Sequence, residues 1–361
     1  MALPVEIIDL IIEHLEGDYP TLAAVALSNR HLCEQSRPLL YSSVFTWNPS
    51  ERRRGPPVSA FVADPKFSQY LHSLIFYSES REDEIWVFLK PGPIFNSMRN
   101  LKELDVATSP EGPPDDILIG NCPFKLKVFC WNRAVAADEF SGLIKFLEQQ
   151  DELEYLAADQ SFPRKEDLPY PASLLPTFGK KLKYLHGNIG IIETVLPGRR
   201  IPTLIWNPLS GDPRRAPQNV VEELGFVIAF SHCSTALALP FTDLRHFFPS
   251  LQFLELVDGD FDVDYEAISD LPSLVGLILR PYTILQLSVA QLRDIFLRCP
   301  KLKFVDVEKR DVNRHVPYKE KRCFDRWMWD PRNEGSYPSI QDTILEYVDF
   351  AQHVRDWVSK N

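Results

Sequence analysis

The sequence lacks the features that mark several common classes of protein. Its 361 residues contain only six cysteines. There is no Cys-x-x-Cys pair, and the spacing fits neither a zinc site nor a dense disulfide scaffold. No stretch approaches the run of about eighteen apolar residues that a membrane span needs. We therefore expect reduced thiols, a location in the cytosol or nucleus, and no membrane partner.

Positive charge is also scarce. Lys and Arg total 39 against 50 for Asp and Glu, which gives a formal net charge of -11. A chain with this balance repels phosphate backbones and anionic lipid headgroups, so we expect no nucleic-acid partner. The N-terminus has no basic start, and Glu6, Asp9 and Glu13 interrupt its apolar run. This predicts neither a secretory signal nor a transmembrane segment there.

The motifs of common active sites are missing as well. Neither Gly-x-Ser-x-Gly, nor a phosphate-binding Gly-x-x-x-x-Gly-Lys-Ser/Thr, nor His-Glu-x-x-His occurs. His232 and Cys233 are adjacent but have no identifiable acid, so a core or surface pair is the simpler interpretation. Acidic residues alternate over 258–264, yet a calcium loop needs Gly and Glu where Val263 and Ser269 stand. We expect no enzyme, no cofactor and no metal.

What the sequence does have is a run of short amphipathic segments at its start. Pro4 suits the first position of a helix, and Glu6 places a negative charge in the first turn. The apolar residues that follow repeat at helical spacing and form a stripe wide enough to be buried on two sides: Ile7, Ile8, Ile11, Ile12 and Leu15. Gly17 and Pro20 are expected to end this helix, and two more short helices are predicted at 22–27 and 31–40. Three helices this short bury too little surface to be stable alone, so they need a partner.

These residues resemble an F-box, in the form common in fungal F-box proteins. The resemblance is carried by Leu3-Pro4-x-Glu6-Ile7, Leu27-Ser28-Asn29-Arg30-x-Leu32 and Arg37-Pro38-Leu39-Leu40-Tyr41. It implies a three-helix module that docks on a Skp-type adaptor and so joins a cullin-based (SCF) ubiquitin ligase. The expected adaptor-binding residues are Leu3, Pro4, Glu6, Ile7, Ile11, Leu15, Leu22, Val25 and Leu32. The alternative is an amphipathic hairpin that only caps the next domain.

A second pattern, Leu-x-x-Leu-x-Leu or a close variant, recurs along the chain. Copies begin at Leu71, Leu101, Leu126, Leu153, Leu182, Ile201, Leu251, Leu274 and Leu302. Proline stands two residues before several of them, as at Pro249 and Pro272, where a helix should end and a strand begin. The pattern resembles the leucine-rich repeat, whose strands turn their leucines inward and stack in parallel about 4.8 Å apart.

The segments between these motifs leave room for outer helices. Residues 140–149 and 289–298 have helical periodicity immediately before a motif. The interval 204–251 holds at most a weak copy, around Leu237 and Leu239, and regular repeats would carry an asparagine where Ser109 and Arg310 stand. We expect an uneven solenoid, and a compact α/β sandwich is the alternative.

The final segment, 311–361, leaves the repeat pattern. Residues 340–358 have the apolar spacing of an amphipathic helix, and a solenoid must cap its open end or expose a sheet edge. We therefore predict a helical C-terminal cap. The alternative uses Trp327, Trp329 and the arginines interleaved with them as a binding patch for an acidic partner, since Trp, Tyr and Arg dominate such patches.

Client recognition is assigned to the open side of the strands. In a repeat of this kind the third and fifth positions face that side, and several carry rings. We predict client binding by Tyr155, Tyr184, His186, Phe253 and Phe304. Tyr155 and Tyr184 belong to neighbouring repeats and are expected to stack. Packing of the same residues against a covering loop is the alternative.

These features together predict an α/β chain in four parts. They are an F-box at 1–45, a linker at 46–64, a leucine-rich-repeat-like solenoid of parallel strands at 65–310, and the cap at 311–361. The resemblance implies a substrate-recognition subunit of an SCF-type ubiquitin ligase, which holds an unknown client protein through its repeats. The alternatives are an adaptor-bound scaffold outside any ligase and a leucine-rich-repeat interaction scaffold not linked to ubiquitination.

Overall fold

The computed structural model describes two compact units, Met1–Leu182 and Lys183–Asn361. The described residues are 4–46, 56–78, 88–89, 92–108, 122–132, 140–158, 174, 177–208, 217–233, 244–257, 268, 271–280, 288–309, 323–329 and 339–343. Both units combine helices with strands that are mostly parallel, so the predicted α/β class is confirmed.

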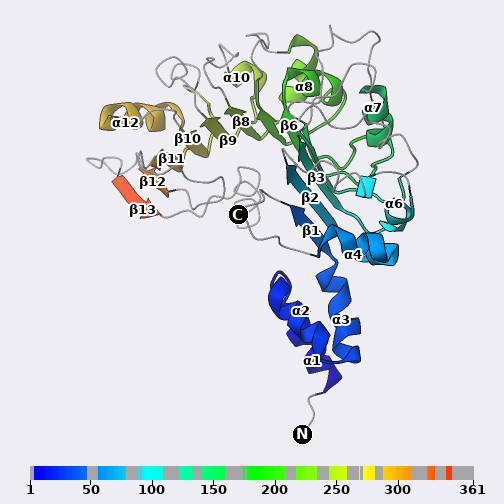
Figure 1. Cartoon of the computed structure of the whole chain (residues 1–361). Coiled ribbons are helices and arrows are strands. Elements are labelled where there is room, and N and C mark those ends of the chain that lie inside the picture. Colours follow the sequence, from blue (N-terminus) through cyan, green and yellow to red (C-terminus); the bar gives the residue numbers. More distant parts are fainter. Residues whose placement is uncertain are drawn as a thin grey trace. The chain divides into compact units, whose positions relative to one another are not determined.

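The first unit begins with three helices, as predicted. They are α1 (Val5–His14), α2 (Tyr19–Ser28) and α3 (Arg30–Leu40) (Figure 1). Gly17 makes the turn after α1 with a φ of 85°, a left-handed conformation that suits glycine. Pro20 opens α2 instead of ending α1. The Asn29 side chain accepts a hydrogen bond from the Leu32 N–H at 2.9 Å and so caps α3.

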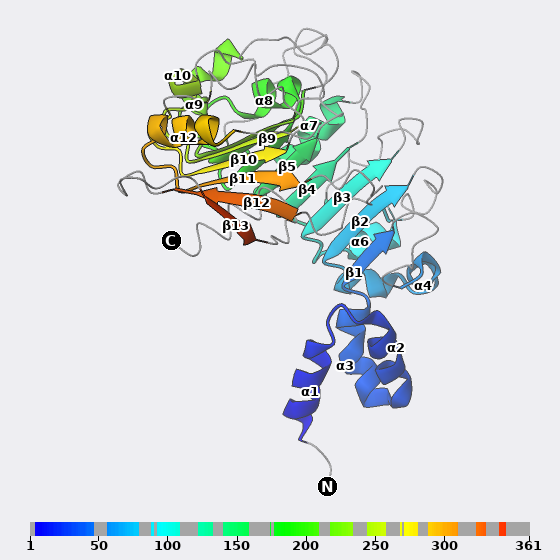
Figure 2. The same ribbon diagram turned by 90° about the vertical axis from the view of Figure 1, so that its left-hand side faces the viewer.

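A parallel sheet follows in the first unit. Its strands, paired in chain order, are β1 (Ser43–Thr46), β2 (Ser73–Ser78), β3 (Glu103–Thr108), β4 (Val128–Trp131) and β5 (Tyr155–Ala158) (Figure 2). Short helices lie between the strands: α4 (Val58–Ala63), a 3-10 helix η1 (Pro65–Tyr70), α6 (Pro93–Ser97) and α7 (Phe140–Glu148). The motif leucines of these strands, such as Leu74 and Leu104, are fully buried, whereas the intervening side chains Glu103 and Asp105 are half-buried.

One backbone arrangement repeats at the start of these strands. The Lys102 carbonyl accepts hydrogen bonds from the N–H groups of both Lys127 (2.7 Å) and Val128 (3.0 Å). The carbonyls of Ser42, His72 and Lys127 likewise each accept two N–H bonds from the start of the neighbouring strand, which is β2, β3 and β5 respectively. Because each repeat is tied to the next through its main chain, the register is kept without a regular pattern of side chains.

The second unit continues the pattern and then changes it. Its parallel strands, again paired in chain order, are β6 (Tyr184–Gly187), β7 (Thr203–Trp206), β8 (Ala229–Cys233), β9 (Phe253–Val257), β10 (Gly276–Arg280) and β11 (Phe304–Lys309). β12 (Cys323–Met328) and β13 (Ser339–Thr343) are antiparallel and extend the sheet beyond β11. The helical elements are α8 (Ile189–Val195), a 3-10 helix η3 (Gln218–Val220), α9 (Val221–Leu224), α10 (Leu244–Phe247) and α12 (Val289–Arg298).

Each leucine motif predicted from the sequence lies at the start of a strand, and the helices predicted at 140–149 and 289–298 are α7 and α12. Two of the parallel strands were not predicted. β8 occupies the interval 204–251, where its motif is Val227-x-x-Phe230-x-His232, and β1 lies ahead of the predicted start of the repeats at 65. Leu237 and Leu239, where a weak copy was expected, lie outside the described residues.

The helical cap predicted at the C-terminus is wrong where it can be compared. Residues 340–343 belong to strand β13, and residues 323–328 form strand β12. The rest of the predicted helix, 344–358, lies outside the described residues. The local spacing suits a helix, but β12, itself paired with β11, offers β13 an edge of backbone donors and acceptors, and pairing with that edge overrides local preference.

Candidate functional site

The three N-terminal helices share a small core of their own. Ile12, Leu22 and Leu40, one from each helix, are buried together. Leu15, Val25 and Leu32 are half-buried and pack against this core. The assignment of Leu22 to the adaptor surface is therefore wrong, because a side chain 2% exposed on a core of three short helices has no surface to offer.

The opposite side of α1 is apolar and faces solvent. Ile7, Leu10 and Ile11 are 43%, 50% and 49% exposed. Positions i, i+3 and i+4 lie on one face of a helix, so these side chains form one stripe, which we call the α1 stripe. Pro4 and Glu6 are exposed beside its start, and Leu3 lies outside the described residues. Of the expected adaptor-binding residues, Pro4, Glu6, Ile7 and Ile11 are thus accessible.

Sequence reasoning left two accessible leucines, Leu10 of the stripe itself and Leu27 of α2, out of the expected adaptor surface. The spacing of Leu10 from Ile7, three residues along a helix, is the signal that could have placed it on this face. Leu27 in α2 is 89% exposed. Its place next to the polar end of α2, Ser28 and Asn29, is the only feature that could have indicated exposure.

Aromatic contacts join α3 to the first repeat. The ring of Tyr41, directly after α3, stacks on Phe67 of η1 with centroids 4.2 Å apart and meets the edge of Phe61 of α4 at 5.6 Å. The Arg37 guanidinium lies 5.9 Å from the Phe67 ring. Burial raises the pKa of the Tyr41 hydroxyl. These contacts hold the end of α3 against α4 and η1.

The predicted client stripe is only partly accessible. Tyr155, Tyr184 and His186 are half-buried. Phe253 and Phe304 are 0% and 6% exposed, so the expectation that they face an open surface was wrong. Both pack in a cluster of apolar side chains, and the covering loop of the alternative stays untested. Tyr155 lies in β5 of the first unit and Tyr184 in β6 of the second, so the expected stacking of the two rings stays a prediction.

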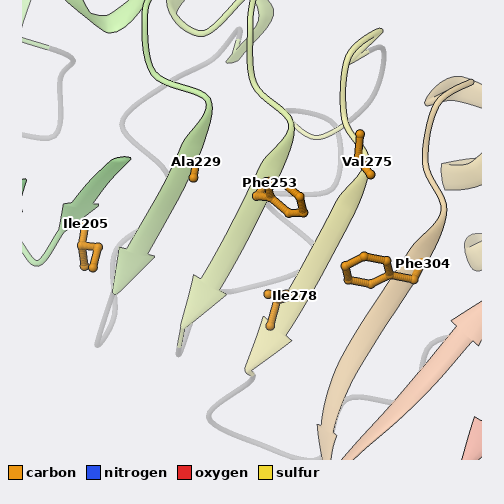
Figure 3. Close-up of a cluster of buried hydrophobic side chains, with 6 residues drawn as sticks. All are labelled: Ile205, Ala229, Phe253, Val275, Ile278 and Phe304. Atoms are coloured by element: carbon orange, nitrogen blue, oxygen red, sulfur yellow. The ribbon is translucent and has the colours of Figure 1, made fainter. Parts of the chain in front are cut away.

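Phe253 and Phe304 belong to a second apolar cluster, on the sheet face opposite the motif leucines. Its members are Ile205, Ala229, Phe253, Val275, Ile278 and Phe304 (Figure 3). Gly276 separates the two rings on the strand between them, and a Cβ there would lie 2.5 Å from the Phe304 Cζ and 3.0 Å from Phe253. The glycine in line with two phenylalanines was the feature of the sequence that could have indicated this packing.

Charged side chains line the same face beside the cluster. Glu255, 2% exposed, accepts hydrogen bonds from the Ser231 hydroxyl (2.6 Å) and the Arg280 guanidinium (3.1 Å). Arg280 also donates to Glu308 at 3.2 Å. On the next strands Arg326 holds Asp306 through two bonds of 2.7 and 2.6 Å, and its guanidinium lies 4.4 Å from the Phe304 ring. These hydrogen bonds and ion pairs compensate for the free-energy cost of burying the carboxylates. We therefore interpret the network as a stabilising feature of the sheet and not as a binding site.

The His232–Cys233 pair does not have the surroundings of a nucleophile and its base. His232 is buried on the side of the motif leucines, with the rings of Trp206 and Phe230 at 5.8 and 6.2 Å. Burial lowers the pKa of its imidazole to about 4. A base is most effective when its pKa lies near the working pH, so His232 is best described as a neutral core side chain.

The remaining chemical possibilities were also compared with the structure. The acidic run 258–264 lies outside the described residues. Within the described part of the chain, no three His, Cys, Asp or Glu side chains gather as metal ligands would. The same part contains no helix with the length and apolar character to cross a membrane. The cysteines described, Cys33, Cys122, Cys130, Cys233 and Cys299, are thiols.

Comparison with known proteins adds no relative. No protein-family model matches this chain, and no curated protein matches its sequence. A function must therefore be argued from the chain's own residues.

Proposed function

We propose that this protein is a non-enzymatic substrate-recognition subunit of an SCF-type ubiquitin ligase. The observation that carries the proposal is the α1 stripe: Ile7, Leu10 and Ile11 face solvent on a helix whose other side already packs in a core. Large apolar side chains grouped on one accessible face mark interaction surfaces. They occur within the segment that resembles an F-box, whose expected partner is a Skp-type adaptor.

The client is proposed to bind the strands of the first unit. There the third and fifth positions of the repeat, including Glu103, Asp105, Val128 and Tyr155, are half-buried and within reach of a partner. In the second unit the equivalent side chains from β7 onward, such as Phe253 and Glu255, are buried, whereas Tyr184 and His186 of β6 are half-buried. A receptor of this kind needs no catalytic group, because holding the client near the transfer machinery raises its effective concentration.

Adaptor capture tests the docking half of the proposal. The intact chain is passed over an immobilised Skp-type adaptor as wild type and as the Ile7→Asp, Ile11→Asp double variant. Because both side chains are exposed, the variant should keep the wild-type melting temperature while its capture falls at least about tenfold, as expected when central apolar anchors of an interface of about 1,600 Å² are lost.

Val62→Asp is the matched control, since Val62 is 56% exposed on α4, away from the α1 stripe. It should be captured like the wild type. Equal recovery of wild type and the α1 variant, or no recovery of either, would exclude docking through α1. The rival interpretation, a scaffold outside any ligase, predicts adaptor capture without assembly of a cullin.

A further inference from the structure

Helix α12, in the second unit, carries an accessible stripe that mixes apolar and basic side chains. Val289, Arg293 and Leu297 are spaced by four residues and therefore share one helix face. Val289 is 44% exposed, Leu297 is 57% exposed, and Arg293 is also exposed. The buried side chains Leu292, Ile295 and Phe296 occupy the other side and secure the helix to the unit.

An aromatic ring extends this stripe. Trp329, directly after β12, is half-buried; its ring lies 5.8 Å from the Arg293 guanidinium and meets the Phe296 ring at 6.0 Å and 82°. The tryptophan therefore links β12 to the outer face of α12. Trp and Arg together are the residue types that contribute most to binding at protein interfaces.

Among the described residues, this face carries basic side chains, whereas the chain as a whole is acidic. Asp294 is the one acidic residue of α12, and it pairs with Arg298 at 2.9 Å. Arg293 on the stripe and the exposed Lys301 after the helix add positive charge. A local basic surface on a chain of net charge -11 favours a partner whose binding segment is acidic.

We propose that the face formed by Val289, Arg293, Leu297 and Trp329 binds an acidic amphipathic helix of another protein. Apolar side chains of that helix would pack against Val289 and Leu297, since residues four apart on one helix fit between the side-chain rows of another. Its carboxylates would meet Arg293 and Lys301. This surface lies in the second unit and does not depend on the adaptor-docking proposal, which concerns α1.

The probe is a fluorescent sixteen-residue peptide with leucines on one helical face and glutamates beside them; a matched peptide carries lysine in place of each glutamate. Fluorescence anisotropy with the intact protein should show saturable binding of the acidic peptide, weakened by raising NaCl, and weaker binding of the basic one. The Arg293→Glu and Leu297→Ser variants should each bind the acidic peptide at least about tenfold more weakly.

Two controls separate this surface from general effects. Phe226→Ser removes a side chain that is 37% exposed elsewhere in the second unit and should leave peptide binding unchanged, and adaptor capture through α1 should be the same for all these variants. Equal binding of the two peptides, wild-type binding by Leu297→Ser, or no binding would overturn the proposal. Self-association of the protein in sedimentation equilibrium that Leu297→Ser abolishes would also overturn it, because the occupant would be a second copy of this chain.

Discussion

Gly276 lies between two phenylalanines on the neighbouring strands, and both rings approach the space that a side chain at position 276 would fill. Phe253 and Phe304 can pack on the same face of the sheet because this position has no Cβ. Their burial removes from the surface two residues that sequence reasoning assigned to client binding. Position within a repeat predicts which face a side chain lies on, but the neighbouring residues decide whether that face is accessible.

Gly276→Ala is expected to destabilise the protein by about 1 to 3 kcal/mol, because the new methyl group overlaps the Phe304 ring. The free energy of unfolding from urea titration measures the cost. Made in a Phe304→Ala background, the same substitution should cost clearly less, since the ring that it meets is gone. An identical cost in the two backgrounds would contradict the packing of Phe304 over Gly276.

His232 gives the protein a predictable response to acid. Burial disfavours the imidazolium and lowers the pKa of His232 from its ordinary value of 6.5 to about 4. Between pH 6.5 and pH 4 the His232 imidazole is therefore protonated in the unfolded chain but neutral in the folded one. The free energy of unfolding is highest above pH 6.5 and falls by up to about 3 kcal/mol as the pH drops toward 4.

Urea midpoints measured between pH 7 and pH 4.5 check this response. His232→Leu should show a flatter fall in stability toward low pH than the wild type does. His31→Gln, which changes an exposed histidine, should keep the wild-type slope. A His232→Leu profile parallel to the wild type would show that protonation of this residue does not govern the acid response.

At the scale of elements, the sequence predicted the strands well because each one carries its own local pattern. Leucines at fixed spacing, often after a proline, were sufficient to find β2 and its successors. β8 was missed because His232 takes the place of the last leucine, and a histidine is not expected in a core. β13 was mistaken for a helix because its pairing with β12 is a contact between strands that the spacing of its own apolar residues does not show.

The same limit explains the result for the N-terminal helices. Apolar spacing identified α1, α2 and α3, yet it could not divide their side chains between a shared core and a free surface. Leu22 turned inward and Leu10 outward, and only the packing of three helices fixes that choice. A helix with two apolar sides is predicted to need a partner protein, but the sequence pattern does not show which side packs in the core and which side binds that partner.

Helix α12 depends on its first turn. The Ser288 hydroxyl accepts a hydrogen bond from the Gln291 N–H at 3.2 Å, and the Gln291 side chain accepts one from the Ser288 N–H at 2.9 Å. Ser288→Ala should cost about 1 kcal/mol, because it leaves a helix donor without its cap. Hydrogen–deuterium exchange should then be faster in the first turn of α12, while Ser250→Ala, outside any helix, should leave it unchanged.

At the scale of the whole molecule, accessible surfaces are distributed unevenly among the described residues. The α1 stripe and the α12 face present apolar side chains to solvent. On the face of the second unit that carries Phe253 and Phe304, by contrast, the apolar side chains are buried in a cluster and the carboxylates are held in ion pairs. This distribution is what the proposed function requires of a protein that joins partners, since two separate faces offer apolar side chains for contact.

The most direct test of this account is reconstitution of the intact chain with a purified Skp-type adaptor and a cullin, followed by size-exclusion chromatography. The account predicts one complex containing all three proteins in equal amounts, and loss of this chain from it when Ile7 and Ile11 are changed to Asp. A complex of adaptor and cullin that forms while this chain elutes alone would contradict it.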